Sequence, residues 1–231
     1  MFHFLNQHLH LNNYYTINNS TDLANNLTRL KINDNHRLIT LDIKDLYVNI
    51  SIEEIIHTTR IQLLKHNDQQ TTNQICNILG TILGQNYFAF QDQCYQPHKG
   101  VAKGSPLSGT IAEIFLQHLE NSHIKPLLDS KCIIFYSRYV DDVLVIYDVI
   151  RTNPEMIVHH ANSMHSDIQL STTLETNNQI SFLDIFIIRK SQQLEIDNLE
   201  NLPRLTPPSF TYLITPWNKN CPPTDITLKE C

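Results

Sequence analysis

The alternation of apolar and polar residues predicts a strand and two helices in the first part of the chain. Residues 37–43 (RLITLDI) alternate and are rich in β-branched side chains, which is typical of a β-strand. Residues 52–66 place apolar side chains at helical spacing, and Ser51 with Glu54 matches a capping box at the start of that helix. We expect a second helix over residues 72–83.

The middle of the chain predicts two hairpins and a helix between them. Residues 87–90 and 94–96 flank a short polar turn, and residues 110–122 carry apolar side chains at helical positions after a loop of small residues. Two strongly apolar segments follow, residues 131–139 and 143–147. Their close spacing indicates a tight β-hairpin.

The last patterned segments predict a helix and a further hairpin. Asn153 and Pro154 mark a helix start, with asparagine as the N-cap and proline in the first turn. Residues 170–176 and 180–188 flank an Asn-Asn pair, which favours a turn. After about residue 190 the chain becomes proline-rich and irregular, while residues 1–30 are polar and weakly patterned.

The order of these elements predicts the fold class α+β. Apart from the first small hairpin the pattern is β-α-β-β-α-β, which implies a ferredoxin-like split βαβ arrangement, an antiparallel sheet with helices on one face. We expect the main domain at residues 37–190, preceded by residues 1–36 and followed by an irregular tail at 191–231. Fold class alone indicates no function.

Three aspartates stand where an apolar strand does not favour them. Asp42 ends the first strand, and Asp141 and Asp142 lie at the tip of the tight hairpin. If the first strand lies beside the hairpin, the three carboxylates meet at one edge of the sheet, and a hard divalent ion would offset their repulsion. Because successive strand residues point to opposite faces, we expect Asp141 to be the direct partner of Asp42. Alone, an Asp-Asp pair is more often a solvated turn.

Four motifs change that interpretation. They are LDIKDLYVNI at 41–50, KGVAKGSPLSGTIAEIF at 99–115, YSRYVDDVLVIY at 136–147 and ISFLDIFIIR at 180–189. The first three stand in the order and spacing of polymerase motifs A, B and C, and YVDD in a hairpin resembles the reverse transcriptase signature. Together the four motifs resemble the reverse transcriptases of Penelope-like retroelements over residues 38–190.

The resemblance implies a polymerase palm with the activity of an RNA-directed DNA polymerase, which adds deoxynucleotides to a primer 3′-hydroxyl on an RNA template. Asp42, Asp141 and Asp142 match the catalytic, metal-binding carboxylates, which would hold two Mg²⁺ ions, with Mn²⁺ as a possible substitute. Glu113 resembles the acid of the AEIF segment, and we leave it out of the catalytic set because it lies on a helix face.

The resemblance also implies nucleotide-binding residues. Tyr47 matches the aromatic residue that closes off the 2′-hydroxyl of the incoming nucleotide, and its alternative is a core aromatic. Gly104, Ser105 and Pro106 match the loop that lies against the nascent base pair, where glycine allows close backbone approach; an ordinary turn into a helix is the alternative. Residues 182–184 resemble the segment that supports the primer strand, and a plain core hairpin explains them equally well.

Charge and length add a further expectation. The formal net charge of -6 is unusual for a nucleic-acid enzyme, because phosphate binding favours a basic surface. The family places a basic fingers subdomain before motif A and a thumb after the fourth motif, whereas only 41 residues precede Asp42 in this sequence. We therefore expect truncated fingers and thumb, with residues 1–36 as a remnant of the fingers.

Two alternatives to an active reverse transcriptase remain. One is a catalytically inactive, retroelement-derived palm fragment that binds nucleic acid or protein weakly. The other is an RNA-copying RNA polymerase, but its hairpin usually reads GDD, and YVDD with an aromatic at Tyr47 argues against it.

The partners implied by the resemblance are an RNA template, a DNA primer and deoxynucleoside triphosphates. No apolar run reaches the length of about 20 residues that a membrane helix needs, and the polar, histidine-rich start does not resemble a secretory signal. We expect an intracellular, nuclear protein without a membrane partner.

Overall fold

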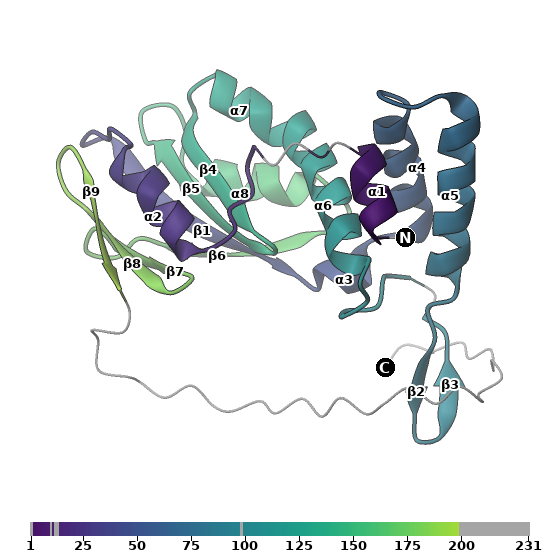
Figure 1. Cartoon of the computed structure of the whole chain (residues 1–231). Helices are drawn as coiled ribbons and strands as arrows, with labels where there is room; N and C mark the ends of the chain where they lie inside the picture. Colours follow the sequence, from purple (N-terminus) through teal and green to yellow (C-terminus); the bar gives the residue numbers. More distant parts are fainter. Residues whose placement is uncertain (1, 10, 12–13, 98, 199–231) are drawn as a thin grey trace. The chain divides into compact units, whose positions relative to one another are not determined.

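The structure is a computed structural model that describes residues 2–9, 11, 14–97 and 99–198 (Figure 1). These residues form two compact units. The first unit contains residues 2–9, 47–97 and 99–108, and the second contains residues 11, 14–46 and 109–198. The chain passes between the units within helix α3 (Leu46–Asn49) and at the start of helix α6 (Ser108–Leu119).

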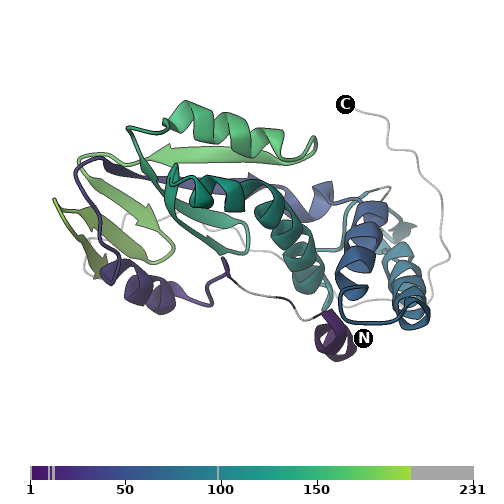
Figure 2. The same ribbon diagram turned by 90° about the horizontal axis from the view of Figure 1, so that it is seen from above.

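The second unit is built on a four-stranded antiparallel sheet with the strand order β4-β5-β1-β6. Its strands are β1 (His36–Lys44), β4 (Ile133–Tyr139), β5 (Asp142–Asp148) and β6 (Gln169–Leu174). The predicted first strand and the predicted tight hairpin are therefore confirmed. Strand β1 lies inside the sheet, with β5 on one side and β6 on the other (Figure 2).

One face of this sheet packs against helices. Ile39 and Val145 of the sheet share a buried cluster with Ile157 and Ala161 of α8 (Pro154–Ser163). Helix α6 continues into a π-helical turn, η1 (Glu120–Ile124), and then into α7 (Lys125–Asp129), whose leucines pack against the same cluster. The predicted helices after residues 110 and 153 are thus confirmed, and the architecture mixes helix and sheet as expected.

The start of α8 follows the predicted capping chemistry. The Asn153 side chain accepts a hydrogen bond from the Met156 amide at 2.8 Å, and Pro154 occupies the first turn. Asparagine satisfies one free amide of the helix start, and proline has no amide to satisfy.

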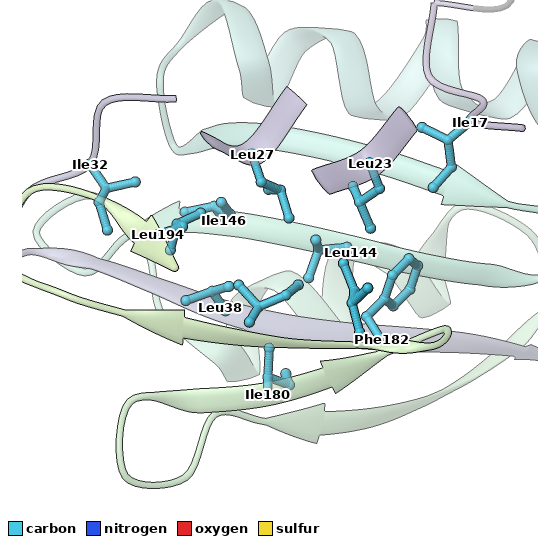
Figure 3. Close-up of a cluster of buried hydrophobic side chains, with 12 residues drawn as sticks. Ile17, Leu23, Leu27, Ile32, Leu38, Leu144, Ile146, Ile180, Phe182 and Leu194 are labelled. Atoms are coloured by element: carbon cyan, nitrogen blue, oxygen red, sulfur yellow. The ribbon is translucent and has the colours of Figure 1, made fainter. Parts of the chain in front are cut away.

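The opposite face of the sheet is also covered, which corrects the expectation of helices on one face only. Leu38 and Leu144 of this face pack with Leu23 and Leu27 of α2 (Ser20–Thr28) and with Phe182 (Figure 3). Helix α2 carries few apolar residues among many polar ones, so its sequence has no continuous apolar stripe from which the helix could be predicted.

The predicted hairpin of residues 170–176 with 180–188 is wrong. Residues 169–174 form β6 and pair with β1, whereas residues 180–188 divide into two strands of a second sheet at Leu183, whose φ is +52°. This sheet has the order β7-β8-β9, with β7 (Gln179–Phe182), β8 (Ile185–Arg189) and β9 (Leu194–Asn198). The Asn-Asn pair does form a turn, with φ values of 53° and 61°.

A partly buried ion pair ties the second sheet to the first. The Glu175 carboxylate accepts a hydrogen bond from the Leu38 amide of β1 at 3.1 Å and lies 2.8 Å from Nη2 of Arg189 in β8. Glu175 therefore holds the chain segment between β6 and β7 against both sheets.

Regular structure extends past residue 190. Strand β9 pairs with β8, so the expectation of an irregular tail from residue 191 is wrong for residues 194–198. The remainder of that expected tail, residues 199–231, lies outside the described residues.

The first unit consists mainly of helices. It contains α1 (Phe2–Leu9), α4 (Ile52–Leu63) and α5 (Gln69–Gly84), followed by the hairpin of β2 (Phe88–Phe90) and β3 (Gln93–Tyr95). The predicted helices and small hairpin are confirmed. The Ser51 side chain makes no capping hydrogen bond at the start of α4, whereas Asp68 caps α5 through the Thr71 amide at 2.9 Å. No helix within the described ranges is long and apolar enough to cross a membrane.

Candidate active site

The register of β1 and β5 brings the three predicted aspartates to one end of the large sheet. Asp42, near the end of β1, is the register partner of Asp142, the first residue of β5. Asp141 lies in the turn just before β5, and its carbonyl oxygen accepts a hydrogen bond from the Ile43 amide at 3.0 Å. Backbone hydrogen bonds therefore join two segments that lie far apart in the sequence.

The cross-strand pair is Asp42 with Asp142, while the expectation that Asp141 is the direct partner of Asp42 at a metal stays a prediction. Only Val140 and Asp141 connect β4 to β5, so Asp141 belongs to the turn and Asp142 opens the strand. Directly opposed residues of antiparallel strands project to the same face. By alternation, Asp42 and Asp142 share the sheet face that carries Leu144.

The turn that carries Asp141 is strained. Val140 has a φ of +54°, in the left-handed region, which a β-branched residue rarely adopts. This conformation costs about 1–2 kcal/mol relative to the right-handed one. Contacts around the turn must therefore hold Val140 in place.

The three carboxylates concentrate negative charge. Burial raises the pKa of the Asp142 carboxyl, and repulsion from Asp141 and then from Asp42 raises it further. Ser171 of β6 donates a hydrogen bond from its hydroxyl to Asp42 Oδ2 at 3.2 Å. In the folded chain without a bound cation, the charged form of Asp142 is thus disfavoured.

Carboxylate oxygens are the ligands that hard divalent ions prefer, so the type of donor and its uncompensated charge both suit such an ion. Among the described residues, however, no group of three or more His, Cys, Asp or Glu side chains is already arranged to hold a metal. The fit therefore rests on the chemistry of the donors and on their shared edge of the sheet.

The predicted nucleotide gate, Tyr47, lies in α3 and is half-buried, so it is not a fully buried core aromatic. Its carbonyl oxygen accepts a hydrogen bond from the Val101 amide at 2.7 Å. Gly100 packs directly against this backbone: a Cβ atom there would lie 2.7 Å from the Val48 oxygen and 2.8 Å from the Tyr47 oxygen, and its φ is +88°.

Gly100 is the residue that sequence reasoning missed. It stands next to a lysine in a loop of small residues, where nothing local distinguishes it from Gly104. The contact that requires glycine at position 100 is made by α3, which lies about fifty residues earlier in the sequence and could not be recognised without the fold.

The predicted loop of Gly104, Ser105 and Pro106 forms the turn into α6. Gly104 has a φ of +95°, but no heavy atom lies within 4 Å of a Cβ built there. Backbone conformation therefore explains this glycine within the chain itself, and its close approach to a nascent base pair stays a prediction. Ser105 donates its amide to the Ala102 carbonyl at 3.1 Å, and its own carbonyl accepts from the Ser108 amide at 3.1 Å.

The structure thus brings Asp42, Asp141 and Asp142 together in the second unit, and it brings Tyr47 and Gly100 together in the first. Residues 182–184 form the β7–β8 turn region, where Phe182 is buried in the core cluster of Figure 3. The core-hairpin interpretation therefore holds for Phe182.

Comparison with known proteins identifies the family. The family model described as "Reverse transcriptase (RNA-dependent DNA polymerase)" matches residues 5–179. The chain belongs to the reverse transcriptase family. No curated protein matches this reverse transcriptase-family chain significantly.

Solved structures share the fold of this reverse transcriptase domain. An apo telomerase from Candida tropicalis, truncated from its C-terminal domain, has a TM-score of 0.65 at 14% identity, covering 85% of this chain and 44% of its own. A telomerase from Candida albicans in complex with a fragment of telomeric RNA has a TM-score of 0.65 at 15% identity, covering 88% and 38%. At these identities the likeness shows the fold alone, and this chain spans less than half of either telomerase chain.

An RNA polymerase shows the same fold at greater distance. The BmCPV RNA-dependent RNA polymerase in its quiescent state has a TM-score of 0.53 at 16% identity, covering 81% of this chain and 19% of that polymerase.

Replacing Gly100 by alanine tests the contact with α3. Both Gly100→Ala and Gly104→Ala place a Cβ at positive φ, which costs about 1–2 kcal/mol. Gly100→Ala also forces a Cβ into backbone oxygens, so we expect it to lower the free energy of unfolding, measured in urea, by more than Gly104→Ala. Equal losses for the two variants would contradict the packing of residue 100 on the Tyr47 backbone.

Replacing Asp142 by asparagine tests the combined cost of burial and charge repulsion at this carboxylate. Because the folded-state pKa of Asp142 is raised, the folded chain binds its proton more tightly than the unfolded chain, and stability falls as pH rises through the interval between the two pKa values. With a chelator present at pH 7, Asp142→Asn should therefore raise the free energy of unfolding, and the difference from wild type should shrink toward pH 3. The matched control is Asp184→Asn, an exposed carboxylate in the β7–β8 turn; a gain of the same size there would contradict the site-specific explanation.

Proposed function

We propose that this chain is the catalytic palm of an RNA-directed DNA polymerase that extends a primer 3′-hydroxyl with deoxynucleotides on an RNA template. The observation that carries the proposal is the pairing of Asp42 with Asp142, which brings the acidic residues of motifs A and C together at one end of the sheet. The family match supports the reaction class, and the motifs support the assignment to motifs A, B and C.

The finer family assignment rests on the four sequence motifs. Their similarity to Penelope-like reverse transcriptases supports a retroelement origin and, with it, a nuclear location. The chain order β-α-β-β-α-β with the sheet order β4-β5-β1-β6 supports a split βαβ palm.

In this proposal Asp42, Asp141 and Asp142 hold Mg²⁺, or Mn²⁺ in its place. When bound, such ions lower the pKa of the attacking hydroxyl and stabilise the negative charge of the leaving pyrophosphate. Asp42 and Asp142 lie on two strands paired in register, and Asp141 lies in the turn whose carbonyl bonds to the Ile43 amide, so backbone hydrogen bonds set the spacing of the three residues.

The nucleotide-binding residues act by shape. The Tyr47 ring excludes a 2′-hydroxyl, and Gly100 fixes the backbone that carries this ring. Gly104, Ser105 and Pro106 contact the nascent base pair, with RNA template, DNA primer and deoxynucleoside triphosphates as the partners.

An inactive palm fragment is the second candidate. It is favoured by the net charge of -6, since a polymerase that holds a duplex needs basic surface to neutralise phosphates.

Primer extension separates the two candidates. We expect the purified chain to extend a DNA primer on an RNA template with Mg²⁺ or Mn²⁺, and Asp141→Asn to lower the rate at least about 100-fold, because metal-assisted charge stabilisation supplies several kcal/mol. Asp129→Asn is the control that removes an exposed carboxylate at the end of α7, outside the site. No extension by a wild-type chain that circular dichroism shows to be folded would favour the inactive fragment.

A sugar-discrimination assay tests Tyr47. Tyr47→Ala should raise the efficiency of ribonucleotide relative to deoxyribonucleotide incorporation about 10-fold or more, because the alanine leaves room for the 2′-hydroxyl. Tyr87→Ala removes an exposed aromatic from the same unit and should leave the ratio unchanged. An unchanged ratio in Tyr47→Ala would remove the gate role.

A further inference from the structure

Arg138 is an almost completely buried cation close to the YVDD turn. Its exposed fraction is 1%, and it is one of the largest fully buried side chains among the described residues. It lies in β4, two residues before the strained Val140. A buried guanidinium is stable only with charged and hydrogen-bonding partners, so its surroundings indicate its role.

Two glutamates from the helical layer fix the guanidinium. Arg138 Nε lies 2.6 Å from Glu120 Oε1, and both terminal nitrogens lie 3.1 Å from Glu113 Oε2. The Tyr136 hydroxyl donates to Glu120 Oε1 at 3.0 Å. Burial acts to lower the pKa of Arg138, but the charge and hydrogen bond of Glu120 and then the charge of Glu113 together outweigh it, so the pKa is raised and this cation keeps its charge.

The Arg138 backbone is fixed from a third direction. Its amide donates to the Tyr15 carbonyl at 2.8 Å, and its carbonyl accepts from the Ile17 amide at 2.9 Å. Thr16, between these two residues, accepts from Arg138 Nη2 at 3.2 Å and donates to Glu113 Oε1 at 2.6 Å. Segments before β1, within α6 and η1, and within β4 therefore meet at this one side chain.

One remaining contact of the guanidinium reaches the turn itself. Arg138 Nη1 donates to the Val140 carbonyl at 3.2 Å. This carbonyl belongs to the residue with φ of +54° and precedes the amide of Asp141. The bond therefore acts on the peptide group between Val140 and Asp141, whose orientation determines how the turn leads into Asp141 and Asp142.

We propose that Arg138 is a positioning residue: clamped by Glu113 and Glu120, it holds the Val140 carbonyl and so fixes the strained turn that presents Asp141 and Asp142. The consequence for catalysis rests on the proposed function, whereas the effect on the turn does not. Glu113, which the sequence left as a structural residue, anchors this clamp. Lysine cannot replace the arginine, because its single ammonium cannot serve two carboxylates and a carbonyl in the fork geometry of a guanidinium.

The first test replaces Arg138 by lysine, which keeps the charge. We measure amide hydrogen exchange at Ile43, because this amide bonds to the Asp141 carbonyl and reports the position of the turn without any catalysis. Arg138→Lys should speed exchange at Ile43 about 10-fold, with little change at amides at the opposite end of β1. It should also lower kcat for extension about 10-fold while leaving KM for primer-template nearly unchanged.

Two further variants distinguish positioning from simple support of the fold. Thr16→Val removes a partner of the same guanidinium that does not touch the turn, and it should leave Ile43 exchange near wild type. Val140→Gly in the Arg138→Lys background should slow Ile43 exchange again and restore part of kcat, because glycine adopts positive φ without strain. If Arg138 served only to stabilise the core, glycine at position 140 would restore neither the Ile43 exchange rate nor kcat in the Arg138→Lys background.

A paired variant covers the case in which Arg138→Lys does not fold. Arg138→Gln with Glu120→Gln removes one charge of each sign and leaves the turn without its guanidinium, so the same change at Ile43 is expected. Wild-type exchange at Ile43 in a folded Arg138 variant would overturn the proposal, as would a uniform increase along all of β1. Absence of extension by the wild-type chain would remove the proposed function, while the Ile43 exchange would still decide the role of Arg138.

Discussion

The antiparallel register of β1 with β5 is the constraint on which the account depends. It places Asp42 opposite Asp142 and bonds the Ile43 amide to the Asp141 carbonyl, so three acids from two distant segments share one sheet edge. A shift of one residue would send the Asp42 side chain to the other face. Both faces carry buried clusters, with Leu38 on one and Ile39 on the other, so the same register is fixed by the core on both sides.

The acidic edge and the strained turn both cost stability, and the structure compensates for the two costs differently. Val140 has a positive φ, and its own carbonyl accepts a hydrogen bond from Arg138. That arginine is itself held by ion pairs with Glu113 and Glu120. Burial and then carboxylate repulsion raise the pKa of Asp142, and these groups compensate for neither. Carboxylate oxygens with uncompensated negative charge are the kind of donor that hard divalent cations prefer.

Strands and helices with strong periodicity could be predicted from the sequence, and so could the aspartate motif. The capping of α8 by Asn153 could also be predicted from the sequence, because it depends only on local residues. Helix α2, the division of residues 180–188 at Leu183 and the membership of β6 in the large sheet depend on tertiary packing, which short-range patterns do not encode. The contacts of Gly100 and Arg138 could not be predicted for the same reason, because each residue packs against partners that lie far away in the sequence.

Binding of Mn²⁺ to the folded chain tests the central claim most directly, because it requires neither primer nor template. Electron paramagnetic resonance of Mn²⁺ titrated into the wild-type chain should show saturable binding that Mg²⁺ displaces. Asp42→Asn should weaken that binding about 10-fold or more, although residue 42 lies far in sequence from the YVDD hairpin. Equal Mn²⁺ affinity in the wild type and in Asp42→Asn, with both folded, would contradict a metal site built by the pairing of β1 with β5.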